Sequence, residues 1–182
     1  METPLYKNPS GSEDKQDEPD DHAIGRSRGG LTTKTHALVD GRGLPLVLVL
    51  TTGQAGDSPA LPVLLAQLRI PRCGPGRPRT TPVALRGDKA YSAKAHRDAL
   101  RARGVKVVIP EKTDQQANRK NRGSRGGRPV GFDAEDYKNR NVVERAFNKL
   151  KNWRGLATRY DKHAQIYRGG MLLASIVLWL NA

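Results

Sequence analysis

The chain has 182 residues, of which 32 are Lys or Arg and 18 are Asp or Glu, so its formal net charge is +14 at pH 7 and its pI is near 10.3. The single cysteine, Cys73, excludes a disulfide framework and a cysteine-based zinc site. The apolar run 171–180 (MLLASIVLWL) is too short to span a bilayer and predicts a buried core helix, so we expect a cytoplasmic protein that does not bind membranes.

The positive charge is concentrated after the first 21 residues. Residues 1–21 contain seven acids and two lysines, a net charge of −5, so residues 22–182 carry +19. We expect the acidic segment to be disordered, because it is polar and rich in Pro, Ser and Gly. Residues 22–182 are enough for one domain with a substantial core. A domain this basic attracts polyanions, of which nucleic acid is the usual one, although a ribosome-type RNA binder would show the same charge.

Strand and helix patterns alternate along the chain. Residues 34–40 and 45–51 predict an antiparallel hairpin around the turn Gly41-Arg42-Gly43. Ser58 and Pro59 suit the N-cap and first position of a helix. Further elements are expected as a helix at 60–68, a strand at 82–85, a helix at 93–103, a strand at 105–110 and helical segments at 134–153 and 167–181. This alternation indicates an α/β fold with a mixed sheet, and the apolar runs VLVL and VVI favour helices on both faces.

Residues 136–153 (DYKNRNVVERAFNKLKNW) have helical apolar spacing and a narrow polar ridge. At about 100° per residue, Tyr137, Arg140, Glu144 and Lys151 fall within an arc of roughly 60°. Arg140 is close enough in sequence to orient the carboxylate of Glu144. A carboxylate beside fixed cations suits a protein that holds a metal ion and a phosphate backbone together. A solvated face with ion pairs would give the same pattern.

Asp88 is the second candidate carboxylate. It follows the apolar residues 83–85 through Arg86-Gly87, which places it at the carboxyl end of a predicted strand, where α/β proteins tend to build sites. A turn or N-cap residue is the alternative interpretation. Among the other polar residues, His36 alternates with apolar neighbours and is expected to be a satisfied sheet histidine. Trp153 and Trp179 fall on apolar faces and are expected in the core.

Residues 112–129 contain six Lys or Arg and almost nothing apolar, so we expect a mobile basic loop. Its cations could form a nonspecific clamp on DNA or belong to a solvated linker. The candidate DNA-binding residues of this loop are Arg119, Lys120, Arg122, Arg125 and Arg128.

The spacing Tyr-x2-Arg-x3-Glu-x6-Lys resembles the signature around the catalytic glutamate of DDE transposases from bacterial insertion sequences. Further blocks resemble one group, the insertion sequence 5 family: residues 25–43 (GRSRGGLTTKTHALVDGRG), 87–92 (GDKAYS) and 154–161 (RGLATRYD). The resemblance runs from about Asp17 to the C-terminus. It implies an RNase H-like mixed sheet flanked by helices, as a catalytic domain over residues 22–182.

The resemblance also implies a chemistry. A DDE transposase binds double-stranded DNA, cuts it at the ends of the element and joins the 3′ ends to target DNA, with Mg2+ as cofactor and Mn2+ able to replace it. Asp88 and Glu144 are then the catalytic metal ligands. Tyr137, Arg140 and Lys151 would contact DNA or position the glutamate. Such a protein is expected to associate with the nucleoid.

One departure from the family pattern concerns the first catalytic aspartate, which normally ends a strand upstream of Asp17. The chain has no such strand there, and Asp40 lies in the turn DGRG, where a structural role is favoured. Asp20 and Asp21 are further candidates. We therefore expect the C-terminal part of a transposase, with a sheet incomplete at its start and little strand transfer by the chain alone.

Several partners and other functions stay open on the sequence alone. The chain could form a homo-oligomer, or a complex with the product of an upstream reading frame. It could also be a noncatalytic DNA-binding remnant that interferes with intact transposase, a metal-dependent nuclease, or a basic RNA-binding protein.

Overall fold

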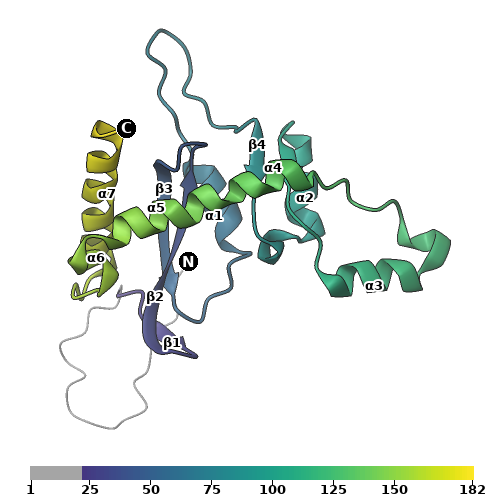
Figure 1. Ribbon diagram of the computed structural model, residues 1–182, viewed down its shortest axis with the longest axis horizontal. Coiled ribbons are helices and arrows are strands. Elements are labelled where there is room, and N and C mark those ends of the chain that lie inside the picture. The colour runs from purple at the N-terminus through teal and green to yellow at the C-terminus, as the bar shows by residue number, and fades with distance from the viewer. Residues whose placement is uncertain (1–21) are drawn as a thin grey trace. The chain divides into compact units, whose positions relative to one another are not determined.

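The computed structural model describes residues 22–182, and Figure 1 gives the order of their helices and strands. Asp20, Asp21 and the acidic segment to which they belong lie outside the described residues. The chain divides into two compact units. Of the described residues, 22–56 and Val143–Ala182 form the terminal unit, and Asp57–Val142 form the central unit.

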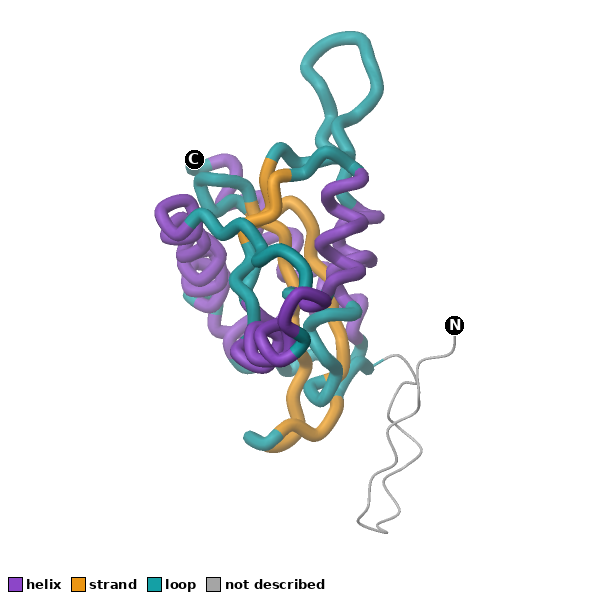
Figure 2. Tube along the Cα trace, turned by 90° about the vertical axis from the view of Figure 1, so that its right-hand side faces the viewer, coloured by secondary structure: helices purple, strands orange, loops and turns teal. Residues whose placement is uncertain are grey.

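The terminal unit contains an antiparallel sheet in the order β1-β2-β3, formed by β1 (Gly25–Ser27), β2 (Gly30–Val39) and β3 (Pro45–Thr52). The paired β2 and β3 are the long strands drawn in orange in Figure 2. The predicted hairpin is therefore confirmed. Asp40 organises its turn, because its Oδ1 accepts hydrogen bonds from the backbone N–H groups of Arg42 at 2.9 Å and Leu44 at 2.8 Å.

Helices α5 (Val142–Lys151), α6 (Arg154–Ala157) and α7 (Ala164–Leu180) complete the terminal unit. Its core joins side chains of β3, α5 and α7, namely Leu48, Leu150, Tyr167, Met171 and Ala174. His36 on β2 is 4% exposed, and its Nε2 lies 2.8 Å from Thr51 Oγ1, which confirms a satisfied sheet histidine.

The apolar C-terminal segment is buried on one face only. Met171, Ala174 and Ser175 are buried, whereas Leu173 is 66% and Leu180 79% exposed. The prediction of a buried core helix holds for one face of α7 and is wrong for the other, because α7 packs one stripe of side chains inward. No helix within residues 22–182 has both the length and the apolar character needed to cross a membrane.

The two tryptophans also lie outside the core. Trp153 is 48% and Trp179 42% exposed, so the prediction that they are core residues was wrong. Trp179 keeps its indole N–H satisfied by donating to the Pro45 carbonyl at 2.9 Å, and the guanidinium carbon of Arg42 lies 5.7 Å from its ring centroid. An aromatic ring with a polar tip can thus follow an apolar pattern and still sit at the surface.

The central unit is built around a parallel pair of short strands, β4 (Ala84–Arg86) and β5 (Lys106–Val108). Its helical segments are α1 (Ala60–Gln67), η2 (Lys89–Tyr91), α2 (Lys94–Ala102), α3 (Thr113–Asn121), η3 (Gly123–Gly126), α4 (Ala134–Lys138) and η4 (Asn139–Asn141). Buried apolar residues include Leu64, Leu100, Val108 and Ile109. Gly104, two residues after the end of α2, has a φ of +69°, a conformation that glycine adopts without strain.

Two local predictions in the central unit were wrong. Ser58 does not cap α1: Pro59 occupies the N-cap position, and Ser58 Oγ lies 2.8 Å from His96 Nε2 instead. The helix predicted at 134–153 is interrupted, because η4 separates α4 from α5.

The basic segment 112–129 is not a loop throughout, because it contains α3 and η3. Gln115 accepts a hydrogen bond from the Lys112 N–H at 3.4 Å, and the helix starts with an acidic side chain and ends with basic ones. No residue of α3 is buried. Capping and charge therefore support a helix that an apolar pattern cannot reveal.

In residues 22–182 the hydrogen-bonded strands form one three-stranded antiparallel sheet and one two-stranded parallel sheet. The α/β class is thereby confirmed. An RNase H-like arrangement of these strands stays a prediction.

Candidate active site

Asp88 lies at the carboxyl end of a parallel strand, as the sequence predicted. The Gly87 N–H continues the ladder by donating to the Val108 carbonyl at 3.2 Å. A Cβ at Gly87 would lie 3.4 Å from side-chain atoms of Ile109 and Tyr91, so this glycine lets the chain pass close to both. Asp88 is exposed, and its side chain makes no capping hydrogen bond to η2. Its carboxylate is thus not used to cap the helix that follows.

A further carboxylate, Asp57, acts on the same tyrosine as Asp88. Burial, followed by the charges of Asp57 and Asp88, raises the pKa of Tyr91 to about 12. Sequence reasoning missed Asp57, because the following Ser-Pro looked like an ordinary helix start. An aspartate before such a start is common, so the sequence gives no signal that distinguishes it.

Glu144 lies in the first turn of α5, whose inward face is fixed by the core of the terminal unit. Ala146 and Leu150 are each 2% exposed, and Phe147 packs against the same cluster. Glu144 and Lys151 are both exposed and lie seven residues apart, so they share another side of the helix. The partial positive charge of the helix N-terminus favours a carboxylate at this position.

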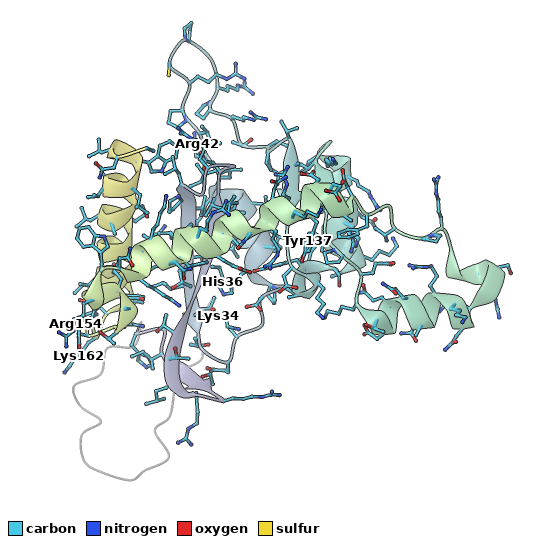
Figure 3. All side chains as sticks on the ribbon, in the orientation of Figure 1. Lys34, His36, Arg42, Tyr137, Arg154 and Lys162 are labelled. Atoms are coloured by element: carbon cyan, nitrogen blue, oxygen red, sulfur yellow. The ribbon has the colours of Figure 1, made fainter. Side chains whose placement is uncertain are left out.

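Tyr137, which is labelled in Figure 3, forms an aromatic–cation pair with Arg140 ahead of α5. The guanidinium carbon of Arg140 lies 5.7 Å from the centroid of the Tyr137 ring, and Phe132 meets that ring edge-on at 5.2 Å between centroids. Tyr137 belongs to α4 and Arg140 to η4. The predicted ridge from Tyr137 to Lys151 is therefore not one uninterrupted α-helix.

A charged network holds α4 against the ends of β4 and β5. Arg86 Nε donates to Asp136 Oδ1 at 2.7 Å, and Lys106 Nζ lies 3.0 Å from Asp136 Oδ2 and 2.9 Å from Asp133 Oδ2. Asp133 also caps α4 by accepting the Asp136 N–H at 2.9 Å. Hydrogen bonds from Arg86 and then from Lys106 lower the pKa of Asp136. The start of α4 is thus tied to the strand that leads to Asp88.

The basic residues proposed for DNA binding are in two different settings. Lys120, Arg122, Arg125 and Arg128 are exposed. Arg119 is half-buried and makes a two-pronged ion pair with Glu111, in which Nη2 donates to Oε2 at 2.7 Å. The hydrogen bonds from Arg119 lower the pKa of Glu111, so the pair is charged on both sides at neutral pH.

The two predicted metal ligands belong to different units, Asp88 to the central unit and Glu144 to the terminal unit. Within residues 22–182 no group of three or more His, Cys, Asp or Glu side chains is arranged to hold a metal ion. Both residues are exposed carboxylates, which supply the oxygen ligands that Mg2+ prefers. Their chemistry therefore fits the cofactor that the resemblance implies.

Comparison with known proteins decides the family. The profile of the family described as the transposase DDE domain matches residues 3–179. The chain belongs to this family. The match begins ahead of Asp17, where the blocks identified from the sequence begin, and so it includes most of the acidic segment.

Relatives support the same conclusion. The chain is 35% identical over 151 residues to a putative transposase for insertion sequence element IS6501 from Brucella ovis, across 83% of this chain and 100% of that protein. It is 30% identical over 156 residues to a putative transposase for insertion sequence element IS402 from Burkholderia cepacia, across 86% of this chain and 65% of that protein. No solved structure matches significantly. Family and relatives support a role in DNA transposition, whereas the insertion sequence 5 assignment stays a prediction.

Proposed function

We propose that this chain acts on double-stranded DNA as a Mg2+-dependent transposase of the insertion sequence 5 family, with an RNase H-like catalytic domain that cleaves element ends and transfers them to target DNA. The family match over residues 3–179 carries the proposal. The exposed Asp88 at the end of a parallel strand supports it, because this is where α/β proteins tend to place reacting groups.

Asp88 and Glu144 are the proposed metal ligands. When bound, Mg2+ would activate the attacking hydroxyl and stabilise the leaving oxygen of the phosphodiester. The chain's part is to present carboxylate oxygens, and the side chains of both residues are exposed. The charge of Asp57 acts on Tyr91 together with that of Asp88, so Asp57 adds negative charge near Asp88 within the central unit.

DNA contacts are proposed for cations on both units. Lys151 shares a side of α5 with Glu144 and would neutralise a backbone phosphate beside the reacting one. Arg140 and Tyr137 are already paired by a cation–π contact, and they would offer a positive charge and a ring edge to a DNA strand. Arg119, Lys120, Arg122, Arg125 and Arg128 would follow the backbone without reading sequence.

The test is strand transfer with labelled element ends and Mg2+, comparing wild type with Glu144→Gln and Glu135→Gln. Glu135 is a matched control, because it is an exposed glutamate of α4 that pairs only locally with Lys138, and its substitution changes the charge equally. We expect Glu144→Gln to lower activity by at least about a hundredfold, while Glu135→Gln retains it. Equal activity of Glu144→Gln and wild type would exclude Glu144 as a ligand.

The same assay separates the other functions. DNA binding without cleavage or joining identifies a noncatalytic remnant, and addition of an upstream-frame product then shows whether a complex is active. Cleavage without joining identifies a nuclease. Mn2+ binding, followed by electron paramagnetic resonance, tests the ligands without activity, since Asp88→Asn and Glu144→Gln should each weaken it. Light scattering of the DNA complex would report a homo-oligomer.

A further inference from the structure

Glu111 and Arg119 form an ion pair that is more sheltered than the exposed pair between Glu135 and Lys138. The side chain of Glu111 is 13% exposed and that of Arg119 is 21% exposed, and both nitrogens of the guanidinium fork meet the two carboxylate oxygens. By comparison, the pair between Glu135 and Lys138 is 82% and 72% exposed. A two-pronged contact of this kind is the geometry in which arginine also binds phosphate.

The surroundings of Arg119 suit a DNA backbone. Lys120 is the next residue in the chain and Arg122 lies three residues after Arg119, and both are exposed. The turn η3 returns to α3 so closely that a Cβ on Gly126 would lie 2.1 Å from the Arg119 carbonyl oxygen, which brings the neighbouring Arg125 to the same place. In this cluster of Arg119, Lys120, Arg122 and Arg125, the charge of Arg119 is matched by the carboxylate of Glu111.

A second arginine, Arg97, contacts the backbone beside Glu111. It is 3% exposed and donates to the backbone carbonyls of Ile109 at 2.9 Å and Pro110 at 3.1 Å, next to Glu111 in the chain. Its Nη1 is buried and has no hydrogen-bond partner among the described residues. The positive charge of Arg97 also helps to lower the pKa of Glu111, so the two groups are within electrostatic reach.

We propose that Glu111 is an internal competitor for DNA phosphate: it occupies Arg119 in the free protein, a backbone phosphate displaces it on binding, and it then turns to Arg97. This rests on the proposed function, since it concerns DNA binding by the same basic segment. After the exchange each guanidinium group faces an anion, because the carboxylate lies at Arg97 while the phosphate takes Arg119. Glu111 thus weakens nonspecific binding to polyanions.

The experiment measures binding of a fluorescein-labelled DNA duplex by fluorescence anisotropy between 50 and 200 mM NaCl. We expect Glu111→Gln to bind several-fold more tightly than wild type at each salt concentration, because Arg119 no longer has to leave a carboxylate. Arg119→Gln should bind more weakly, and its plot of log affinity against log salt should be shallower by about 0.9, the loss of one phosphate contact. The double variant should match Arg119→Gln.

Glu135→Gln is the control, because it removes one negative charge near a lysine but leaves Arg119 paired. An equal gain in Glu135→Gln and Glu111→Gln would mean a general charge effect and overturn the inference. A gain that survives in the double variant would also overturn it, because it would not act through Arg119. If Glu111 only supported α3, Glu111→Gln would weaken binding, and circular dichroism would show helix loss.

The Arg97 step has its own variant. Arg97→Lys keeps the charge but removes Nη1, so it should weaken duplex binding by wild type and leave binding by Glu111→Gln unchanged. Equal weakening in both backgrounds would overturn this step. Strand transfer by wild type tests the proposed function separately, so a failure there is distinguishable from a failure of the Glu111 comparison.

Discussion

The terminal and central units both bury apolar side chains, but charged side chains contribute to them differently. The terminal unit buries a cluster of apolar side chains between a sheet and two helices, with Leu48, Leu150 and Met171 at its centre. The central unit buries apolar side chains such as Leu100 and Ile109, but its strands have only three residues, and charged side chains also join its elements. Arg97 donates to loop carbonyls, and Asp136 joins α4 to both strands. Apolar contacts depend little on pH, whereas charged contacts depend on it directly.

The largest effect is expected in the apolar core. Leu48 is 1% exposed, so Leu48→Ala should lower the free energy of unfolding by about 2–5 kcal/mol. Urea denaturation followed by tryptophan fluorescence measures this selectively, because both tryptophans, Trp153 and Trp179, belong to the terminal unit. Leu173→Ala is the control: Leu173 is 66% exposed on α7 and should change stability by less than about 0.5 kcal/mol. Equal losses would contradict the described core.

The next effect is expected at Arg97 of the central unit. Arg97→Met keeps the bulk of the side chain but removes the donors to the carbonyls of Ser92, Ile109 and Pro110, at a cost of about 1–3 kcal/mol. Hydrogen exchange of the β5 amides should accelerate, while the tryptophan transition stays unchanged. Arg101→Met on the same helix, where the arginine side chain is 53% exposed, should leave both unchanged. A shifted tryptophan transition would show that the units unfold together.

These two predictions also separate what the sequence could and could not reveal. The hairpin of β2 and β3 was predictable, because strong apolar runs flank a glycine turn. Asp88 was predictable because a short apolar strand and a glycine precede it. Such features depend on neighbours in the chain, and local patterns record them.

The polar contacts of the central unit depend instead on residues far apart in the chain. Arg86 is 50 positions from Asp136, and Ser58 is 38 positions from His96, so no local pattern pairs them. The exposed side of α7 was missed for a related reason, since composition indicates an apolar helix but not how many of its faces are covered. The DNA-binding residues and the metal ligands rest on the family pattern, because the described contacts alone do not require them.

Acid should weaken the attachment of α4 in the central unit before it weakens the apolar core of the terminal unit. The pKa of Asp136 is lowered from its ordinary value of 3.8, first by the hydrogen bond from Arg86 and then by that from Lys106. A lowered folded-state pKa means that the stabilisation is present above pH 3.8 and is lost as the pH falls from there through the folded-state value. The protection factors of the α4 amides, taken relative to intrinsic exchange at the same pH, should therefore fall below about pH 4. The tryptophan transition of the terminal unit should change less over this range.

Asp136→Asn sharpens the same comparison, because the amide cannot carry the charge that Arg86 and Lys106 neutralise. The protection factors of the α4 amides should already be low in this variant at neutral pH, and they should depend less on pH than in wild type. Glu135→Gln, one residue earlier but paired only with Lys138, should keep the wild-type pH dependence. A wild-type profile in Asp136→Asn would show that the network does not hold α4.

The smallest effect concerns Tyr91, and it tests the carboxylates at the candidate site. Burial and then the charges of Asp57 and Asp88 raise the pKa of Tyr91 from 10.0 to about 12. The folded state therefore holds the phenolic proton more tightly than the unfolded state, and the stability that this contributes is lost as the pH rises from 10 towards 12. Ultraviolet titration should show a late-ionising tyrosine that is absent in Tyr91→Phe. Asp57→Asn and Asp88→Asn should each lower its pKa. An effect of Asp88→Asn alone would mean that Asp57 is too distant to act with Asp88, and the central unit would then offer the proposed metal site one carboxylate there rather than two.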